Sequence, residues 1–449
     1  MTISAPQLPW NPGVVPPTMR PRSADSSATP STFLPPEPQS LADAGLSKSM
    51  IEALVLKFLL SHGPSTGRQI AAQLRLPFGW LQPLLIEFKS EMLLGFKDSA
   101  LMSDYVFELS DRGLEKSRRH LAHSTYFGAA PVSLDDYVTG IREQSIRRSQ
   151  PRLADMKKAL GDLILPDMVL SQVGQAMNQG RGLFLYGKPG NGKTSIAERV
   201  IRSISPYAWI ERTLMVTGEI LWQFDPRTHK EAQLVSDSSL LESQKYDRRW
   251  VRIRRPTVIA GGELTLSQLD FSGNAQTGVV ESPLQLKSNG GAFVVDDFGR
   301  QRAGNEELLN RWIIPLEKGY DYLTLPSGRQ VQVPFDQMLV FATNLRPQDI
   351  VDEAFLRRIP HKIEVKNPGE GEFRGLLART ARQLELSCAQ KAIEYLIHKH
   401  YLSAGREFRF CHPRDLLTHV KNFCQFHELP SEVTPKNLDI AVHNYFAGL

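Results

Sequence analysis

Cysteine is scarce in this sequence. The chain has 449 residues and three cysteines, Cys388, Cys411 and Cys424, whose spacing fits no metal-ligand motif. A disulfide framework needs paired cysteines, and an odd number leaves one unpaired. The scarcity therefore argues against a disulfide-stabilised secreted protein and predicts reduced thiols in a cytoplasmic one.

Long hydrophobic runs are missing as well. No apolar stretch is long enough to span a bilayer, and the first residues lack the charged-then-apolar pattern of a secretory signal. We therefore expect no membrane insertion. A strong excess of one charge is also absent. The net charge of +5 is modest for this length, so it permits nucleic-acid binding without indicating it.

What the chain does have is enough length for two or three domains, each able to bury a core. Residues 1–45 are rich in Pro, Ser and Thr. Such a composition buries too little apolar surface to fold, so this segment is predicted to be a disordered tail.

Residues 46–125 combine helical periodicity with one strand pattern. Three helices are predicted, from about Ser49, over 67–74 and over 79–94, followed by a strand over 105–109 and a helix over 114–121. This order resembles a winged helix-turn-helix domain. The third helix would enter a DNA groove, but Lys89 is its clearest cation. A docking or regulatory role is therefore favoured, and DNA binding stays open.

The remainder divides by pattern. Residues 126–160 are predicted to be a linker that ends in helices. Residues 161–364 alternate apolar strands with helices, which predicts an α/β core whose parallel sheet is covered on both faces. The expected strands are 182–186, 209–213, 291–295 and 338–343. Residues 365–449 are helical throughout and predict a separate all-α lid domain.

The most informative stretch follows the first of these strands. It matches the Walker A pattern G-x-x-x-x-G-K-T and consists of Gly187, Lys188, Pro189, Gly190, Asn191, Gly192, Lys193 and Thr194, with Ser195 next. Glycines let the loop amides turn toward phosphate oxygens, and the helix that follows directs its positive end at the same anion. The lysine would reach the β- and γ-phosphates, and the threonine hydroxyl would bind Mg²⁺. Residues 187–195 are thus predicted to bind ATP with Mg²⁺.

A second apolar strand ends in two acids, Asp296 and Asp297, which is typical of a Walker B motif. At the carboxyl end of a parallel strand, Asp296 would hold Mg²⁺ and Asp297 would orient or polarise the attacking water. Paired acids after a strand are often only a turn or a helix cap. The upstream phosphate loop favours the catalytic interpretation.

A third apolar strand, Met338–Thr343, is followed by Asn344, and Arg357, Arg358 and Arg414 come later. In this order the motifs resemble those of AAA+ ATPases over about residues 160–430. The resemblance implies that Asn344 is the sensor 1 residue and that Arg357 or Arg358 is an arginine finger for a neighbouring subunit. It also implies that Arg414 is the sensor 2 arginine of the lid, and that the chain forms a ring-shaped homo-oligomer, with a hexamer expected.

The sequence departs from the family pattern in three places. Asp297 stands where the family usually has Glu, which would slow hydrolysis or hold the water differently. An insertion of about 214–288 separates the two motifs and contains an Arg-rich strand pattern over 246–255. Contact of this strand with nucleic acid, with an acidic partner or with solvent alone stays open. Residues 321–333 predict a β-hairpin, which resembles the pre-sensor-1 hairpin branch of the family.

The resemblance to this family therefore implies an ATPase that hydrolyses ATP at subunit interfaces to remodel a protein partner, in the manner of chaperones or MoxR-type proteins. One alternative is a DNA-acting motor or loader that uses the winged-helix-like domain. The other is a slow nucleotide-gated switch, for which Asp297 is the motivating feature. The sequence does not identify the protein substrate.

Overall fold

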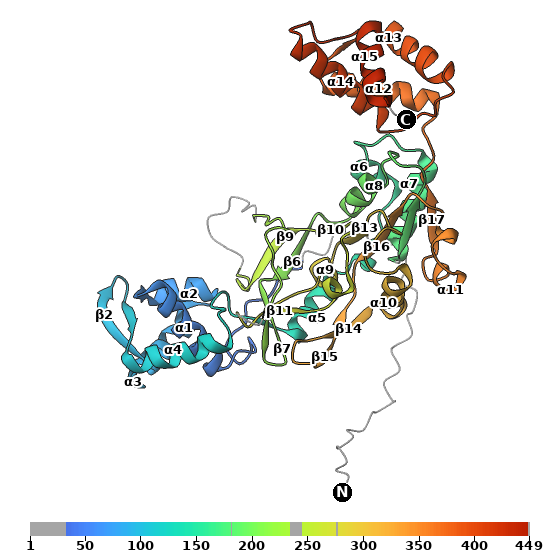
Figure 1. The fold of residues 1–449 in the computed structure, drawn as a ribbon. Coiled ribbons are helices and arrows are strands. Elements are labelled where there is room, and N and C mark those ends of the chain that lie inside the picture. Colours follow the sequence, from blue (N-terminus) through green and yellow to red (C-terminus); the bar gives the residue numbers. More distant parts are fainter. Residues whose placement is uncertain (1–32, 181, 234–244, 275–276, 448–449) are drawn as a thin grey trace, which may run out of the picture. The chain divides into compact units, whose positions relative to one another are not determined.

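The computed structural model describes residues 33–180, 182–233, 245–274 and 277–447. Most of the predicted tail lies outside these residues. Figure 1 shows the elements in chain order.

The first folded region combines helices with a small antiparallel sheet. Its core gathers buried side chains from α1, α2, α3 and β3, among them Ile51, Ile70, Leu85 and Phe107. Thr66 starts α2 with a capping box, in which its side chain accepts from the Gln69 amide. The predicted helices and the predicted strand are confirmed, with these bounds: α1 Lys48–His62, β1 Ser65–Thr66, α2 Gly67–Leu74, α3 Phe78–Ser90, β2 Leu94–Ala100, β3 Asp104–Leu109 and α4 Asp111–His123.

The region that follows is mostly helical and includes one two-residue strand. It contains β4 (Val132–Ser133), α5 (Leu134–Glu143), a 3₁₀ turn (Ile146–Arg148) and α6 (Leu153–Ala159). Helix α7 (Asp167–Gln179) then leads toward the central sheet.

Five parallel strands form the central sheet, in the order β10-β13-β16-β5-β17. The strands span Thr257–Ala260, Ala292–Val295, Met338–Thr343, Leu183–Tyr186 and His361–Glu364, respectively. Helices α7 and α8 (Lys193–Val200) cover one face, where Val173 and Ile196 pack on Leu185 and Val294. Helix α10 (Asn305–Lys318) covers the other face (Figure 1). The predicted α/β class with a parallel sheet is confirmed.

One predicted strand of this sheet is wrong. Residues 209–213 do not join it, because β6 (Tyr207–Glu211) pairs antiparallel with β9 (Trp250–Arg254) in a sheet of its own. Strand β10, from the predicted insertion, occupies the edge of the central sheet instead. Both β6 and β10 are short and mostly apolar, so their pattern could not decide which one the central sheet would include.

The predicted hairpin is confirmed. Strands β14 (Tyr320–Thr324) and β15 (Gln330–Pro334) pair antiparallel around a turn at Pro326-Ser327-Gly328. Their inward side chains, Leu323, Val331 and Val333, pack with a second five-stranded sheet. That sheet has the order β11-β12-β8-β7-β4 and comprises, besides β4, strands Ser272–Asn274, Val279–Glu281, Glu219–Trp222 and Thr213–Val216. The short helix α9 (Leu284–Lys287) contributes Leu286 to this core, whereas α11 (Glu353–Leu356) packs Phe355 into the core between α10 and the central sheet.

The C-terminal region is helical apart from two-residue strands β18 (Ser387–Cys388) and β19 (Glu432–Val433), which pair with each other. Its helices are α12 (Glu370–Gln383), α13 (Gln390–Tyr395) continued by a π-helical stretch (Leu396–Leu402), α14 (His412–Phe426) and α15 (Pro435–Phe446). They enclose a core of their own around Phe373, Tyr401, Leu416 and Leu438.

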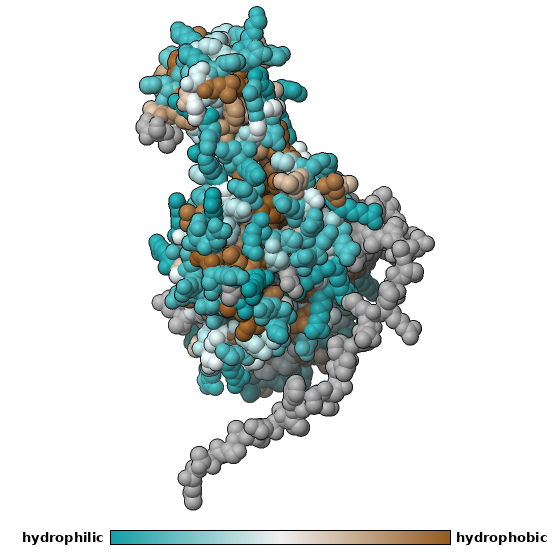
Figure 2. All heavy atoms as spheres, turned by 90° about the vertical axis from the view of Figure 1, so that its right-hand side faces the viewer, coloured by the Kyte–Doolittle hydropathy of each residue, from teal (hydrophilic) through white to brown (hydrophobic). Residues whose placement is uncertain are grey.

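The surface in Figure 2 is mostly hydrophilic, with hydrophobic side chains in separate patches. Among the described residues, no helix is long and apolar enough to cross a membrane.

Glu211, at the end of β6, makes stability depend on pH. It is fully buried, and burial raises its pKa to about 8. The unfolded chain releases this proton near the ordinary pKa of 4.5, so the folded state binds more protons between these values and stability falls as the pH rises through them. Chemical denaturation should find Glu211→Gln as stable as the wild type near pH 4.5, and more stable by about 4 kcal/mol at pH 8.5.

The exposed Glu394 provides a control, because Glu394→Gln should follow the wild-type pH dependence throughout. Equal stability of Glu211→Gln and the wild type at pH 8.5 would contradict this prediction, because it would show that ionising the buried carboxyl costs no stability.

Candidate functional site

The predicted phosphate loop, residues 187–192, connects β5 to α8, and β5 lies between β16 and β17 in the sheet. All three loop glycines have backbone angles that other residues adopt only with strain, since φ is +138° at Gly187, +81° at Gly190 and +79° at Gly192. Gly187 also lies close to the chain after β17. A Cβ atom there would be 2.5 Å from the carbonyl oxygen of Val365. The loop therefore needs glycine at 187 for both space and conformation.

The side chain of Lys193 turns back over this loop. Its ammonium donates to the carbonyls of Gly187 at 2.9 Å and Lys188 at 3.0 Å, and to Oδ1 of Asn344 at 2.7 Å. The residue is 7% exposed, and burial lowers the pKa of the ammonium, although two nearby carboxylates oppose the shift. The charge is therefore held at the mouth of the loop by neutral oxygen acceptors.

The two predicted acids follow β13. The Thr194 hydroxyl, in the first turn of α8, lies 3.0 Å from each carboxylate oxygen of Asp296 and donates to that carboxylate. Asp297 has φ +48°, a conformation that is uncommon for residues other than glycine. This turn leaves Asp297 exposed, whereas Asp296 is half-buried beside α8.

Asn344 joins the two halves of this arrangement. While its Oδ1 accepts from Lys193, its Nδ2 donates to Oδ1 of Asp297 at 3.2 Å. The preceding Thr343 hydroxyl donates to the carbonyl of Phe298 at 2.8 Å, which fixes the chain after the acids against the end of β16. The structure therefore brings together the predicted residues of three neighbouring strand ends.

The loop also contacts the residues after β17 and the C-terminal region. Asn191 is 1% exposed and its Nδ2 donates to the carbonyl of Val365 at 3.2 Å and to Oδ1 of Asn367 at 2.8 Å. The amide of Cys411 donates to the carbonyl of Gly190 at 2.9 Å. The exposed Lys188 pairs with Glu407 of the same region. Of the other two predicted loop residues, Pro189 is exposed and Ser195 is half-buried.

The predicted arginines occupy different positions. Arg357, at the end of α11, is exposed and pairs with Glu353 at 2.9 Å, whereas the more buried Arg358 pairs with Glu317 of α10 at 2.6 Å. Arg414 is exposed in the first turn of α14.

Sequence reasoning missed a different arginine. The Cδ of Arg409 lies 3.9 Å from the position that a Cβ on Gly190 would occupy, so this side chain runs beside the phosphate loop. The pattern Pro413-Arg414-Asp415 pointed to Arg414 instead. The sequence does show three arginines around the start of α14, Arg406, Arg409 and Arg414, but it does not indicate which of them lies beside the loop.

The residues at the ends of β5, β13 and β16 fit a magnesium-bound nucleoside triphosphate. A hydroxyl and a carboxylate, those of Thr194 and Asp296, are oxygen ligands of the kind that Mg²⁺ accepts, and they already lie within hydrogen-bond distance. The ammonium of Lys193 and the loop amides supply positive charge for phosphate oxygens.

Comparisons with known proteins give one family match and several distant structural similarities. Residues 369–444 match the model of a domain of unknown function, DUF8689. No curated protein matches the chain. Among solved structures, NtrX from Brucella abortus in complex with ADP is 12% identical, with 65% of this chain and 58% of that chain covered and a TM-score of 0.40. The RuvB Holliday junction branch migration motor from Thermotoga maritima is 12% identical, with 67% and 73% covered and a TM-score of 0.37.

The glycines of the loop should differ in their tolerance of a side chain. Gly187→Ala should destabilise the protein by about 3 kcal/mol, because the new Cβ meets a backbone oxygen and the conformation is strained. Gly192→Ala should cost about 1 kcal/mol, because its left-handed helical conformation is less costly for alanine and no heavy atom lies within 4 Å of the new Cβ. Chemical denaturation of both variants checks this order, and equal losses would contradict it.

Proposed function

We propose that this protein is an AAA+ ATPase that binds ATP with Mg²⁺ through residues 187–195 and hydrolyses it at an interface between subunits. One observation carries the proposal. Lys193, Thr194, Asp296, Asp297 and Asn344 meet at the carboxyl ends of β5, β13 and β16, which are neighbours in one parallel sheet. In open α/β sheets this edge is where ligands bind.

Each of these residues has a chemical task in the proposal. Lys193 now donates to three neutral oxygens, so phosphate oxygens, which carry charge, are stronger acceptors for it. Thr194 and Asp296 would hold Mg²⁺, and the ion when bound would neutralise charge on the phosphates. Asp297 and Asn344 would orient the attacking water, for which the exposed carboxylate of Asp297 is suitably placed.

The arginine finger is proposed to be Arg357. Its ion pair with Glu353 joins two exposed side chains, so little free energy holds it in place, and it can leave to reach a neighbouring subunit. Arg358 is held against α10 by Glu317 and is the less accessible of the two. A cation that meets developing charge on the phosphoryl group accelerates hydrolysis by orders of magnitude.

Remodelling of a protein partner is the proposed output, and the β14–β15 hairpin is the element proposed to contact that partner. Arg311 of α10 donates through both terminal nitrogens to the buried carboxylate of Asp321, at 2.5 and 2.6 Å, at the base of the hairpin. Helix α10 starts at Asn305, a few residues after Asp297. A change at the catalytic acids would therefore reach the hairpin through one rigid helix.

The ATPase is tested by phosphate release from the full-length protein. Lys193→Ala should lower turnover at least about 100-fold, and Asp296→Ala should do the same and remove the dependence on Mg²⁺. Replacing both Arg357 and Arg358 by Ala should lower turnover about 1,000-fold and leave nucleotide binding, measured by calorimetry, unchanged. Lys391→Ala, at an exposed lysine of α13, is the control.

Normal hydrolysis by the double arginine variant would refute the finger in trans. A burst of one product per site without steady turnover in the wild type would favour the slow switch instead. Absence of ATP binding by the wild type would refute the proposal as a whole.

The position of Arg409 leads to a separate prediction. Because this side chain runs beside Gly190, Arg409→Ala should weaken ATP binding about tenfold, and Arg414→Ala should weaken it less. Calorimetric titration with ATP and with ADP compares the two variants. A larger loss of ATP affinity for Arg414→Ala would instead support Arg414 as the sensor 2 arginine of the lid, as expected from the sequence.

A further inference from the structure

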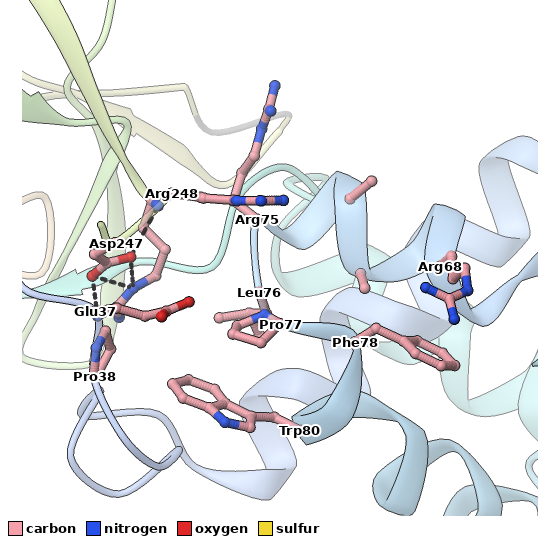
Figure 3. A pocket seen from close by; sticks show the side chains of 13 residues that line it. Glu37, Pro38, Arg68, Arg75, Leu76, Pro77, Phe78, Trp80, Asp247 and Arg248 are labelled. Carbon is pink, nitrogen blue, oxygen red and sulfur yellow. Dashed lines mark hydrogen bonds and ion pairs between the residues drawn. The ribbon is translucent and has the colours of Figure 1, made fainter. Parts of the chain in front are cut away.

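Two adjoining cavities, of about 410 and 560 Å³, open between the α2–α3 segment and the β6–β9 pair. Glu37, Arg75 and Arg248 line both, so the two form one continuous groove, which we call the arginine groove (Figure 3). The walls come from residues 37–38, from 68–80 and from the segments 209–212, 231–233 and 245–252. None of them belongs to the phosphate loop or to the acids that follow β13.

Buried contacts join the walls. Arg249 is 2% exposed and donates to the carbonyls of Ala44 and Pro131, both at 2.9 Å, and its ion pair with Asp247 lies at 2.7 Å. The amide of Asp247 donates to the carbonyl of Pro35 at 3.1 Å. The floor of the groove is therefore built by interactions that need no ligand, and the backbone that carries Arg248 is held in place on both sides by them.

The lining is rich in cations that lack acidic partners. Its basic residues are Arg68, Arg75, Arg212, Lys245, Arg248, Arg249 and Arg252, and its acids are Glu37, Glu231 and Asp247. Two of these acids are already engaged, Asp247 by Arg249 and Glu231 by Arg212. Within the described part of the chain, neither Arg75 nor Arg248 forms an ion pair.

The positive charges in the groove repel one another. Burial lowers the pKa of Arg212, and the positive charge of Arg75 lowers it further. Cations that repel each other across a cavity are stabilised by an anion placed between them. Figure 3 shows Arg75 and Arg248 together at one side of the groove, although they come from segments far apart in the sequence. The groove therefore favours a ligand with several negative charges.

Flat aromatic surfaces alternate with these cations. Phe78 and Trp80 line one cavity, and the half-buried Tyr246, whose ring centre lies 4.9 Å from that of the buried Trp209, lines the other. In Figure 3 the indole of Trp80 lies below Pro77, on the side of the groove away from Arg75. The guanidinium of Arg68 stacks 4.7 Å from the ring centre of Phe78.

We propose that the arginine groove binds single-stranded nucleic acid, with phosphates on the cations and unstacked bases on the aromatic rings. Grooves that alternate cations with aromatic rings are typical of such binding, because every base has a face to stack. A duplex keeps its bases stacked inside, so the rings would have no partner. An acidic peptide would use the cations but would leave the rings unused.

Glu37 then has a defined effect. It is the one acid that lines both cavities, and its carboxylate would repel a phosphate bound beside Arg75 and Arg248. Removing this charge should strengthen binding, which a purely structural role of Glu37 would not do.

The test uses the full-length protein without nucleotide and fluorescently labelled oligothymidylate and oligouridylate of about 16 nucleotides. Fluorescence anisotropy should show binding that Arg75→Gln/Arg248→Gln weakens at least about tenfold, with a salt dependence reduced by about 1.4 in slope. Trp80→Leu, which keeps apolar bulk but removes the flat ring, should weaken binding about tenfold. Glu37→Gln should strengthen it severalfold.

The matched control is Arg118→Gln/Arg254→Gln, which removes the same charge from exposed positions of the same two regions outside the groove. It should bind like the wild type. Stronger binding of one oligonucleotide would identify DNA or RNA as the source of the strand. Equal binding of a duplex, or of poly-glutamate with the same loss in the Arg75/Arg248 variant, would overturn the proposal.

This inference does not depend on the proposed ATPase. The groove variants should leave ATP binding unchanged, and Lys193→Ala should leave oligonucleotide binding unchanged. Failure of either proposal is therefore visible without reference to the other.

Discussion

The candidate site depends on the two hydrogen bonds of the Asn344 side-chain amide. It accepts from Lys193 and donates to Asp297, so it joins the phosphate loop after β5 to the acids after β13 across the strand that lies between them. Any ligand that draws the ammonium away from Asn344 would also release the amide to turn toward Asp297 or away from it.

The parallel sheet places Asn344 between the loop after β5 and the acids after β13. Strands β5, β16 and β13 are parallel and in register, so their carboxyl ends lie at one edge. The two faces are then packed by different residues of each strand, for example Leu185 toward α8 and Phe184 toward α10. A strand buried on both faces cannot slip by one residue without exchanging its two sets of partners, so the positions of Thr343 and Asn344 are fixed by the core.

The sequence alone was sufficient for the elements whose chemistry is local. The glycines predicted the turn after β5, the acid pair predicted the end of β13, and Pro326-Ser327-Gly328 predicted the hairpin, because these residues act through their own backbone and charge. It was insufficient where two candidates share one pattern. Residues 207–211 and 257–260 are both short and mostly apolar, and only the competition for tertiary contacts decides that β10 joins the central sheet. The arginine groove could not be predicted from the sequence either. Arg75 and Arg248 become neighbours only when separate regions pack together.

The placement of β5 has a consequence for how the chain folds. Both of its neighbours, β16 and β17, come more than 150 residues later, as the register Val340 to Leu183 and His361 to Leu183 makes plain. During synthesis this strand therefore leaves the ribosome long before anything can pair with either of its edges. Such long-range closure is slow, and an apolar strand with both edges open is prone to association with other chains. The early helices and the small antiparallel sheet can form meanwhile, so the region around the central sheet is the last part of the molecule to complete its core.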